Sequence, residues 1–381
     1  MTDPELHLVH YETVQEFLHE MKPFDESFMN LALGPLWDDI STNPTRSEER
    51  SELSNRPLFA VLSANVLVMT LTRDTAHQTW KLAIPSTLNP DSVHYQFTIA
   101  GASRLLASTL DALVEPGGIE RIAAPSPVMD VFIDAWATSL SGKGIQITAL
   151  PLDLIARSCY ATRQTVPSSS ACSLPANITI ALAAAEDVSS LVPLFVDFTY
   201  QTHQVAMPEA ARASLSRAVQ GHKLWVCRFD GDLAGFTVVG RETPNTIAIR
   251  NVFVRPEHRR KGIAERMVGV LTRFYLGLDT VLEPHYPMGQ PKREICLLVK
   301  DPAVERIYAR CGFLVGEDVR DPETGRKACY AFVSRGVQTS RQGEKRIRTT
   351  AISSVSALDF KWFNSNRLIG DHATLLNQNE T

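Results

Sequence analysis

The segment that most constrains the fold joins a strand to a helix through a basic turn with one glycine: NVFVRPEHRRKGIA, residues 251–264. The sequence from Thr246 to Val254 predicts a strand, and Pro256 ends it. Behind the turn, apolar side chains recur at helical spacing: Ile263, Met267, Val270, Leu271 and Tyr275. The segment therefore predicts a strand, a turn and an amphipathic helix in immediate succession.

The turn itself has the features of an anion-binding site. The first turn of a helix has backbone N–H groups without intrahelical partners, and the helix dipole adds positive charge there. Gly262 lets an anion approach the main chain without a Cβ in the way, and Ala264 is small. Because Arg259, Arg260 and Lys261 add charge, we expect a site suited to a pyrophosphate. The alternative is a basic helix N-terminus whose glycine merely packs.

The surrounding sequence predicts an ordered series of strands and helices from Ile178 to about Val333. Asp230-Gly231 between two apolar runs is a strong hairpin signal. The order of elements is β-α-α-β-β-β-α-β-α-β-β. We expect residues 1–160 to repeat its later part, as an architectural rather than a sequence repeat. The alternative for this first half is an unrelated α/β domain.

A polar, Ser-rich stretch between these halves, Thr162 to Ser173, predicts a linker. We therefore expect an N-terminal domain over residues 1–160, a linker over 161–177 and a second domain over 178–334. The polar, basic sequence from residue 335 to 381 predicts a disordered tail.

Composition excludes several classes of protein. The formal net charge is −4 and the six cysteines form no CxxC pair, which argues against a general nucleic-acid binder, a zinc site and a disulfide framework. The N-terminus has no apolar signal segment, and the longest apolar run, Pro57 to Leu71, is too short to span a bilayer comfortably. We expect a reduced, cytoplasmic protein without a metal; the oligomeric state stays open.

Two linked segments resemble the GNAT superfamily of N-acetyltransferases. The first is VFVRPEHRRKGIA, residues 252–264, and the second is LLVKDPAVERIYARCGF, residues 297–313. Two motifs in the right order are more specific than either alone. The resemblance covers Ile178 to about Val333 and implies a GNAT fold, in which helices flank a mixed, mostly antiparallel twisted sheet. The first half would then be a degenerate GNAT-like α/β domain, since Asn89 to Ala102 has no basic R-x-x-G.

The resemblance also implies roles for particular residues. Main-chain groups of Val252, Phe253 and Val254 would pair with the pantetheine arm of acetyl-CoA. The pyrophosphate would bind at Arg259, Arg260, Lys261, Gly262, Ile263 and Ala264. Tyr308 would be the general acid for the departing thiolate, although a half-buried core tyrosine is the alternative. Asp301 replaces the usual asparagine and Val304 the usual alanine.

The expected activity is transfer of an acetyl group from acetyl-CoA to a primary amine of a small molecule, by direct attack in a ternary complex. No residue is committed as general base; His258 and Glu294 are weaker candidates, and a water chain would serve as well. The acceptor pocket is expected near Tyr200 to Met207, with Tyr200 and His203, and walled by the first half. Alternatives are a catalytically silent CoA-binding sensor or interaction module, and O-acylation or a longer acyl chain in the same fold.

Overall fold

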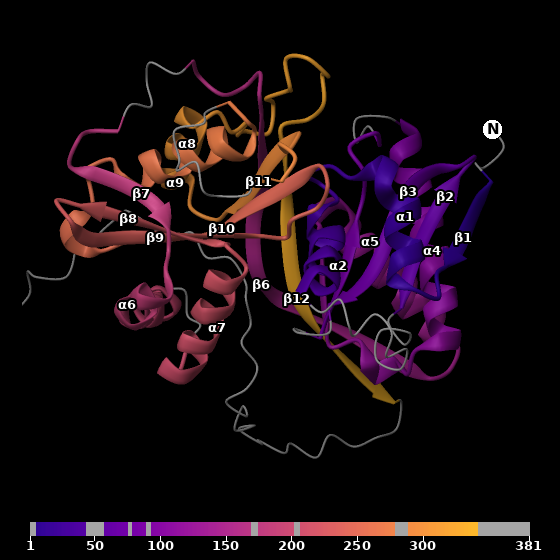
Figure 1. Ribbon diagram of the computed structural model, residues 1–381. Coiled ribbons are helices and arrows are strands. Elements are labelled where there is room, and N and C mark those ends of the chain that lie inside the picture. Colours follow the sequence, from indigo (N-terminus) through magenta and orange to yellow (C-terminus); the bar gives the residue numbers. More distant parts are fainter. Residues whose placement is uncertain are drawn as a thin grey trace, which may run out of the picture.

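A single mixed sheet of twelve strands forms the centre of the protein in a computed structural model, which describes residues 5–42, 57–74, 78–88, 93–168, 174–201, 206–278 and 289–341 (Figure 1). The strand order is β1-β2-β3-β4-β5-β12-β6-β11-β10-β9-β8-β7. The predicted class, α/β with a mixed sheet flanked by helices, is confirmed. No helix in the described ranges is long and apolar enough to cross a membrane.

The first half of the chain contributes six strands, and its helices lie together on the right in Figure 1. Its main elements are β1 (Leu6–His10), α1 (Val14–Met21), α2 (Asn30–Thr42), β2 (Leu58–Ser63), β3 (Val66–Asp74), β4 (Thr79–Ala83), α4 (Val93–Leu113), β5 (Arg121–Pro125), α5 (Ser126–Ser141) and β6 (Ile145–Thr162).

The second half repeats this order of strands and helices. Its main elements are β7 (Ile178–Leu182), α6 (Val188–Gln201), α7 (Pro208–Gln220), β8 (Leu224–Phe229), β9 (Asp232–Gly240), β10 (Thr246–Val254), α8 (Ile263–Tyr275), β11 (Glu294–Val299), α9 (Pro302–Arg310) and β12 (Cys329–Arg341). The predicted architectural repeat is therefore present in the structure.

The two halves exchange their last strands at the centre of the sheet. Strand β12 of the second half lies between β5 and β6, and β6 of the first half lies between β12 and β11. Cys159 of β6, for example, is opposite Cys329 of β12 on one side and Leu297 of β11 on the other. Each half therefore completes the sheet of the other.

This exchange corrects two expectations from the sequence. Residues 335–341, expected to begin a disordered tail, continue β12 and pair with β6 from Leu152 to Ile145. Main-chain pairing does not depend on side-chain polarity, so a polar segment extends a strand when a partner lies beside it. Of the last two strands in the expected order of elements, the first is only a single bridge between Leu314 and Tyr160. How the chain divides into domains stays a prediction, and residues 342–381 lie outside the described ranges.

Helices cover both faces of the sheet. On one face, α8 and α9 pack over the second half, and α4 and α5 over the first. Two residues of β12 show that this is the same face, because Cys329 joins the α8–α9 core while Val333, four residues on, joins the α4–α5 core. The opposite face carries α6 and α7 over the second half, and α1 and α2 over the first.

Candidate functional site

Strands β10 and β11 are parallel neighbours that separate after a short stretch of pairing. They pair only over Thr246–Ala248 and Glu294–Cys296. A bulge in β10 between Ile249 and Asn251 then changes its register against β9. A bulge bends the strand that contains it, while β11 continues to Val299 against β6. Within the described part of the chain, the β10 edge that faces β11 therefore has no partner strand from residue 251 to 254.

The side chains of this edge anchor it on both faces of the sheet. Val252 and Val254 pack in the core beneath α8 and α9, whereas Phe253 packs with Phe195 and Phe236 on the opposite face. All three predicted residues of β10 are at most 3% exposed. The side chains of all three residues are therefore part of the core, and a contact between their main-chain groups and a bound molecule stays a prediction.

The turn after β10 has an unusual backbone. A short 3-10 turn, Pro256–His258, precedes it, and both Arg260 (φ 60°) and Gly262 (φ 73°) are left-handed. Gly262 is the N-cap of α8, and its carbonyl accepts the Arg266 N–H at 3.1 Å. The N–H groups just before Arg266 therefore precede the regular bonding of the helix. A left-handed arginine costs on the order of 1–3 kcal/mol, and such strain clusters at ligand-binding sites.

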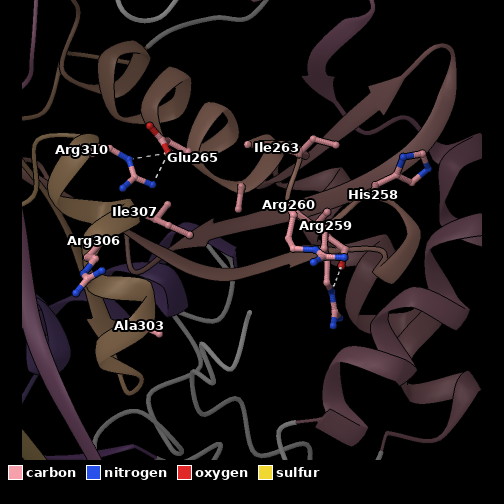
Figure 2. A pocket seen from close by; sticks show the side chains of 12 residues that line it. His258, Arg259, Arg260, Ile263, Glu265, Ala303, Arg306, Ile307 and Arg310 are labelled. Atoms are coloured by element: carbon pink, nitrogen blue, oxygen red, sulfur yellow. Dashed lines mark hydrogen bonds and ion pairs between the residues drawn. The ribbon is translucent and has the colours of Figure 1, made fainter. Parts of the chain in front are cut away.

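A pocket of about 400 Å³ lies at this turn, between the start of α8 and the outer face of α9 (Figure 2). It brings together six of the residues that the sequence predicted: Val254, Arg259, Arg260, Gly262, Ile263 and Ala264. The rest of its lining is His258, Glu265, Ala303, Arg306, Ile307 and Arg310. The residues that form it are consistent with an anion site at a helix N-terminus.

Two of the three predicted cations at the turn already interact with other groups of the protein. The Arg259 guanidinium donates from Nε to the Val254 carbonyl at 3.1 Å and from Nη2 to Gln201 Oε1 at 3.2 Å. The Lys261 ammonium lies 4.7 Å from the centre of the Phe229 ring. Arg259 still lines the pocket, whereas Lys261 does not. The phosphate contacts expected of both residues stay predictions.

Tyr308 lies on the sheet-facing side of α9 and does not line the pocket. It is 1% exposed, and its ring makes an edge contact with Phe313 at a centroid distance of 5.9 Å. Burial, followed by the neighbouring Cys311 and Cys159 thiols, raises the pKa of its phenol well above the usual value. The phenol therefore keeps its proton at neutral pH. Its catalytic role stays a prediction.

The two weaker base candidates have different surroundings. Glu294 accepts the Ser27 N–H at 2.8 Å and pairs with Arg326 at 2.8 Å, so it joins segments of the two halves. His258 lines the pocket, and its buried Nδ1 has no hydrogen-bond partner within the described residues. In the expected acceptor segment, Tyr200 is exposed near the end of α6, and His203 lies outside the described ranges.

The sequence interpretation missed the contribution of α9 to the pocket. Helical spacing gives the signal, because Ala303, Arg306, Ile307 and Arg310 recur at i, i+3, i+4 and i+7. The buried residues Val304 and Tyr308 occupy the other face of the same helix. Asp301, which replaces the usual asparagine, caps this helix by accepting the Ala303 N–H at 2.9 Å. No group of three or more His, Cys, Asp or Glu side chains in the described part of the chain could hold a metal ion.

A family model described as the acetyltransferase (GNAT) domain matches residues 220–315, which include β10, the basic turn and α9. These residues form a GNAT domain. The match covers both motifs on which the resemblance was based, and it contains every residue of the pocket. The GNAT resemblance predicted from the sequence is thus confirmed.

Solved structures similar to the chain as a whole include three GNAT proteins. A tandem GNAT protein from the clavulanic acid biosynthesis pathway is 14% identical, with 87% of this chain and 98% of that one covered and a TM-score of 0.40. A GNAT-family acetyltransferase from Colwellia psychrerythraea is 11% identical (87% and 99% covered, TM-score 0.44). A GCN5-related N-acetyltransferase from Sphaerobacter thermophilus is 12% identical (90% and 98% covered, TM-score 0.42). Among curated proteins, no sequence matches.

Proposed function

We propose that this GNAT protein transfers an acetyl group from acetyl-CoA to a primary amine of a small molecule, by direct attack in a ternary complex. The observation that carries the proposal is the open edge of β10 leading into the pocket at the basic turn. An extended pantetheine arm would add to this edge as an extra strand. The diphosphate would then reach the N–H groups at Gly262, Ile263 and Ala264.

The chemistry requires donors near the reacting carbonyl. A main-chain N–H of Val252 to Val254 on the open edge would stabilise negative charge that develops on the thioester oxygen. Tyr308 would donate a hydrogen bond to the departing sulfur. Because the thiol pKa is about 8.5 and burial raises that of Tyr308 above its usual value, complete proton transfer is uphill. We therefore assign the phenol a hydrogen-bonding role in which it keeps most of its proton, and the proton that the amine loses as the N–C bond forms and the C–S bond breaks neutralises the thiolate.

The decisive experiment measures donor binding and turnover separately. Purified protein is titrated with acetyl-CoA by calorimetry, then incubated with acetyl-CoA and a panel of primary amines while the free thiol is followed. We expect binding and, with at least one amine, thiol release above the hydrolysis rate. Absence of acetyl-CoA binding would rule out the donor site itself.

A second candidate function is a catalytically silent CoA-binding sensor or interaction module. The burial of Tyr308 and its absence from the pocket walls favour it, as does the involvement of Glu294 in contacts between the halves. This reading predicts tight acetyl-CoA binding with no acetyl transfer to any amine in the panel. Mass spectrometry of the amines distinguishes the two candidates, because it detects the acetylated product directly.

A further inference from the structure

The pocket contains more arginine than the turn after β10 alone provides. Arg259 and Arg260 come from that turn, and Arg306 and Arg310 come from α9, one helical turn apart. Glu265 is the only carboxylate in the described lining. The formal charge of these five groups is therefore +3, from four arginines and one glutamate.

Two of the four guanidinium groups are already engaged by the protein. Arg259 donates to Val254 and Gln201. Arg310 donates to Glu265 Oε2 from Nε at 2.8 Å and from Nη2 at 2.7 Å, as the dashed lines in Figure 2 mark. These two arginines are thus less available to a bound phosphate.

The other two, Arg260 and Arg306, have no bonded partner in the described part of the chain. Figure 2 shows them on different walls, with Arg260 at the turn and Arg306 on α9. The side chains of Ala303 and Ile307 lie beside Arg306 on the same wall. The pocket therefore presents two separate available cations, with an apolar strip next to the second.

A CoA donor carries two phosphate groups at this end, the diphosphate and a phosphomonoester on the 3′ position of the ribose. We propose that Arg306 binds the 3′-phosphate and so makes the protein select CoA over dephospho-CoA. The proposal rests on the donor site proposed above. A phosphomonoester is nearly doubly charged at neutral pH and bonds well to a guanidinium. The strip of Ala303 and Ile307 offers an apolar surface to the adenine ring.

The Glu265–Arg310 ion pair affects binding of the diphosphate rather than of the 3′-phosphate. Glu265 lies in the first turn of α8, beside the expected diphosphate site. Its charge would repel phosphate if it were not paired, and Arg310 neutralises it. Loss of Arg310 should therefore weaken binding of CoA and dephospho-CoA equally, whereas loss of Arg306 should weaken CoA binding alone.

Calorimetric titrations with CoA and with dephospho-CoA test this difference. The variants are Arg306→Gln, Arg306→Lys, Arg310→Gln and Arg104→Gln; Arg104 is an exposed arginine on α4 and serves as a charge-matched control. We expect the wild-type protein to bind CoA about tenfold more tightly than dephospho-CoA, the effect of one charge-assisted contact. Arg306→Gln should remove this preference and leave dephospho-CoA affinity within about twofold. Arg306→Lys should retain part of it, and Arg104→Gln all of it.

Three results would overturn the inference. The first is equal affinity of the wild-type protein for CoA and dephospho-CoA. The second is an equal loss of both affinities in Arg306→Gln, and the third is an unchanged preference in that variant. Wild-type protein that binds neither molecule would instead remove the proposed donor site, and the inference with it. Because Arg306 is exposed, unfolding curves of the variants should match that of the wild-type protein.

Discussion

The two halves of the molecule share one framework but differ in charge at the same place. In both, a parallel strand pair separates after a short contact: β4 and β5 pair at Trp80 and Lys81, and β10 and β11 at Thr246–Ala248. The connection from β10 to α8 contains three arginines and a lysine, whereas residues 84–92, between β4 and α4, contain no lysine or arginine and one aspartate. Both halves of the fold therefore contain the strand separation, but only the second half places cations beside it that could bind an anion.

The shared framework raises the question of whether either half folds without the other. Strand β6 pairs with β11 through Thr162–Arg157 and with β12 over most of its length. A fragment of residues 163–381 therefore lacks the strand that joins β11 to β12. We expect it to show no cooperative unfolding transition and no donor binding, and to recover both when it is refolded with a fragment of residues 1–162.

A matched control keeps every strand and breaks only the connection. A protease site placed after residue 168 lies beyond the end of β6 and before β7. The cleaved protein should remain one complex in gel filtration and keep its donor affinity. A fragment of residues 163–381 that folded alone would show that the exchange of strands is dispensable for the second half.

The next largest effect concerns the left-handed glycine of the turn. Gly262→Trp should lower acetyl-CoA affinity about a thousandfold, because it removes two charge-assisted contacts worth roughly 1.5–3 kcal/mol each. The first half offers a matched control in Gly144, which is also left-handed (φ 69°) and has open space around it. Gly144→Trp imposes the same backbone strain and should leave acetyl-CoA affinity unchanged.

Equilibrium dialysis with labelled acetyl-CoA measures both affinities. The thermal unfolding midpoints of the two variants should fall by similar amounts, since each places a bulky residue at positive φ. If Gly262→Trp bound the donor as well as the wild-type protein, the anion site would have to be elsewhere.

The sequence predicted local features better than distant pairing. The turn at Gly262 was predictable because strand, turn and helix are adjacent in the chain, and each has a local pattern. The central exchange was not, since the alternation in β6 and β12 is the same whichever strand lies beside them. Arg306 was missed for another reason, because its spacing with Ile307 and Arg310 identifies one helix face but does not tell which neighbour that face meets.

The smallest expected effect comes from replacing a buried tyrosine in each half. Tyr308 and Tyr95 are both buried, and burial raises the pKa of both phenols, that of Tyr95 to about 12. Only Tyr308 lies in the core next to the open edge of β10. Tyr308→Phe should lower kcat about a hundredfold with little change in KM, because it removes a hydrogen bond to sulfur that strengthens only as the thiolate departs. Tyr95→Phe should change neither constant.

The pH dependence of this loss distinguishes a hydrogen-bonding role from packing. Because the folded pKa of Tyr308 is raised above its ordinary value near 10, the phenol stays protonated through pH 10. The ratio of wild-type to Tyr308→Phe kcat should therefore be constant from pH 7 to pH 10. The free energy of unfolding changes with pH for the same reason. The contribution of the buried neutral phenol is fully present below pH 10, the pKa of the unfolded tyrosine, and is lost as the pH rises from there through the raised pKa of the folded protein. A kcat ratio that fell toward one near pH 9 would show that Tyr308 loses its proton there, and equal kcat values at every pH would leave it only a packing role.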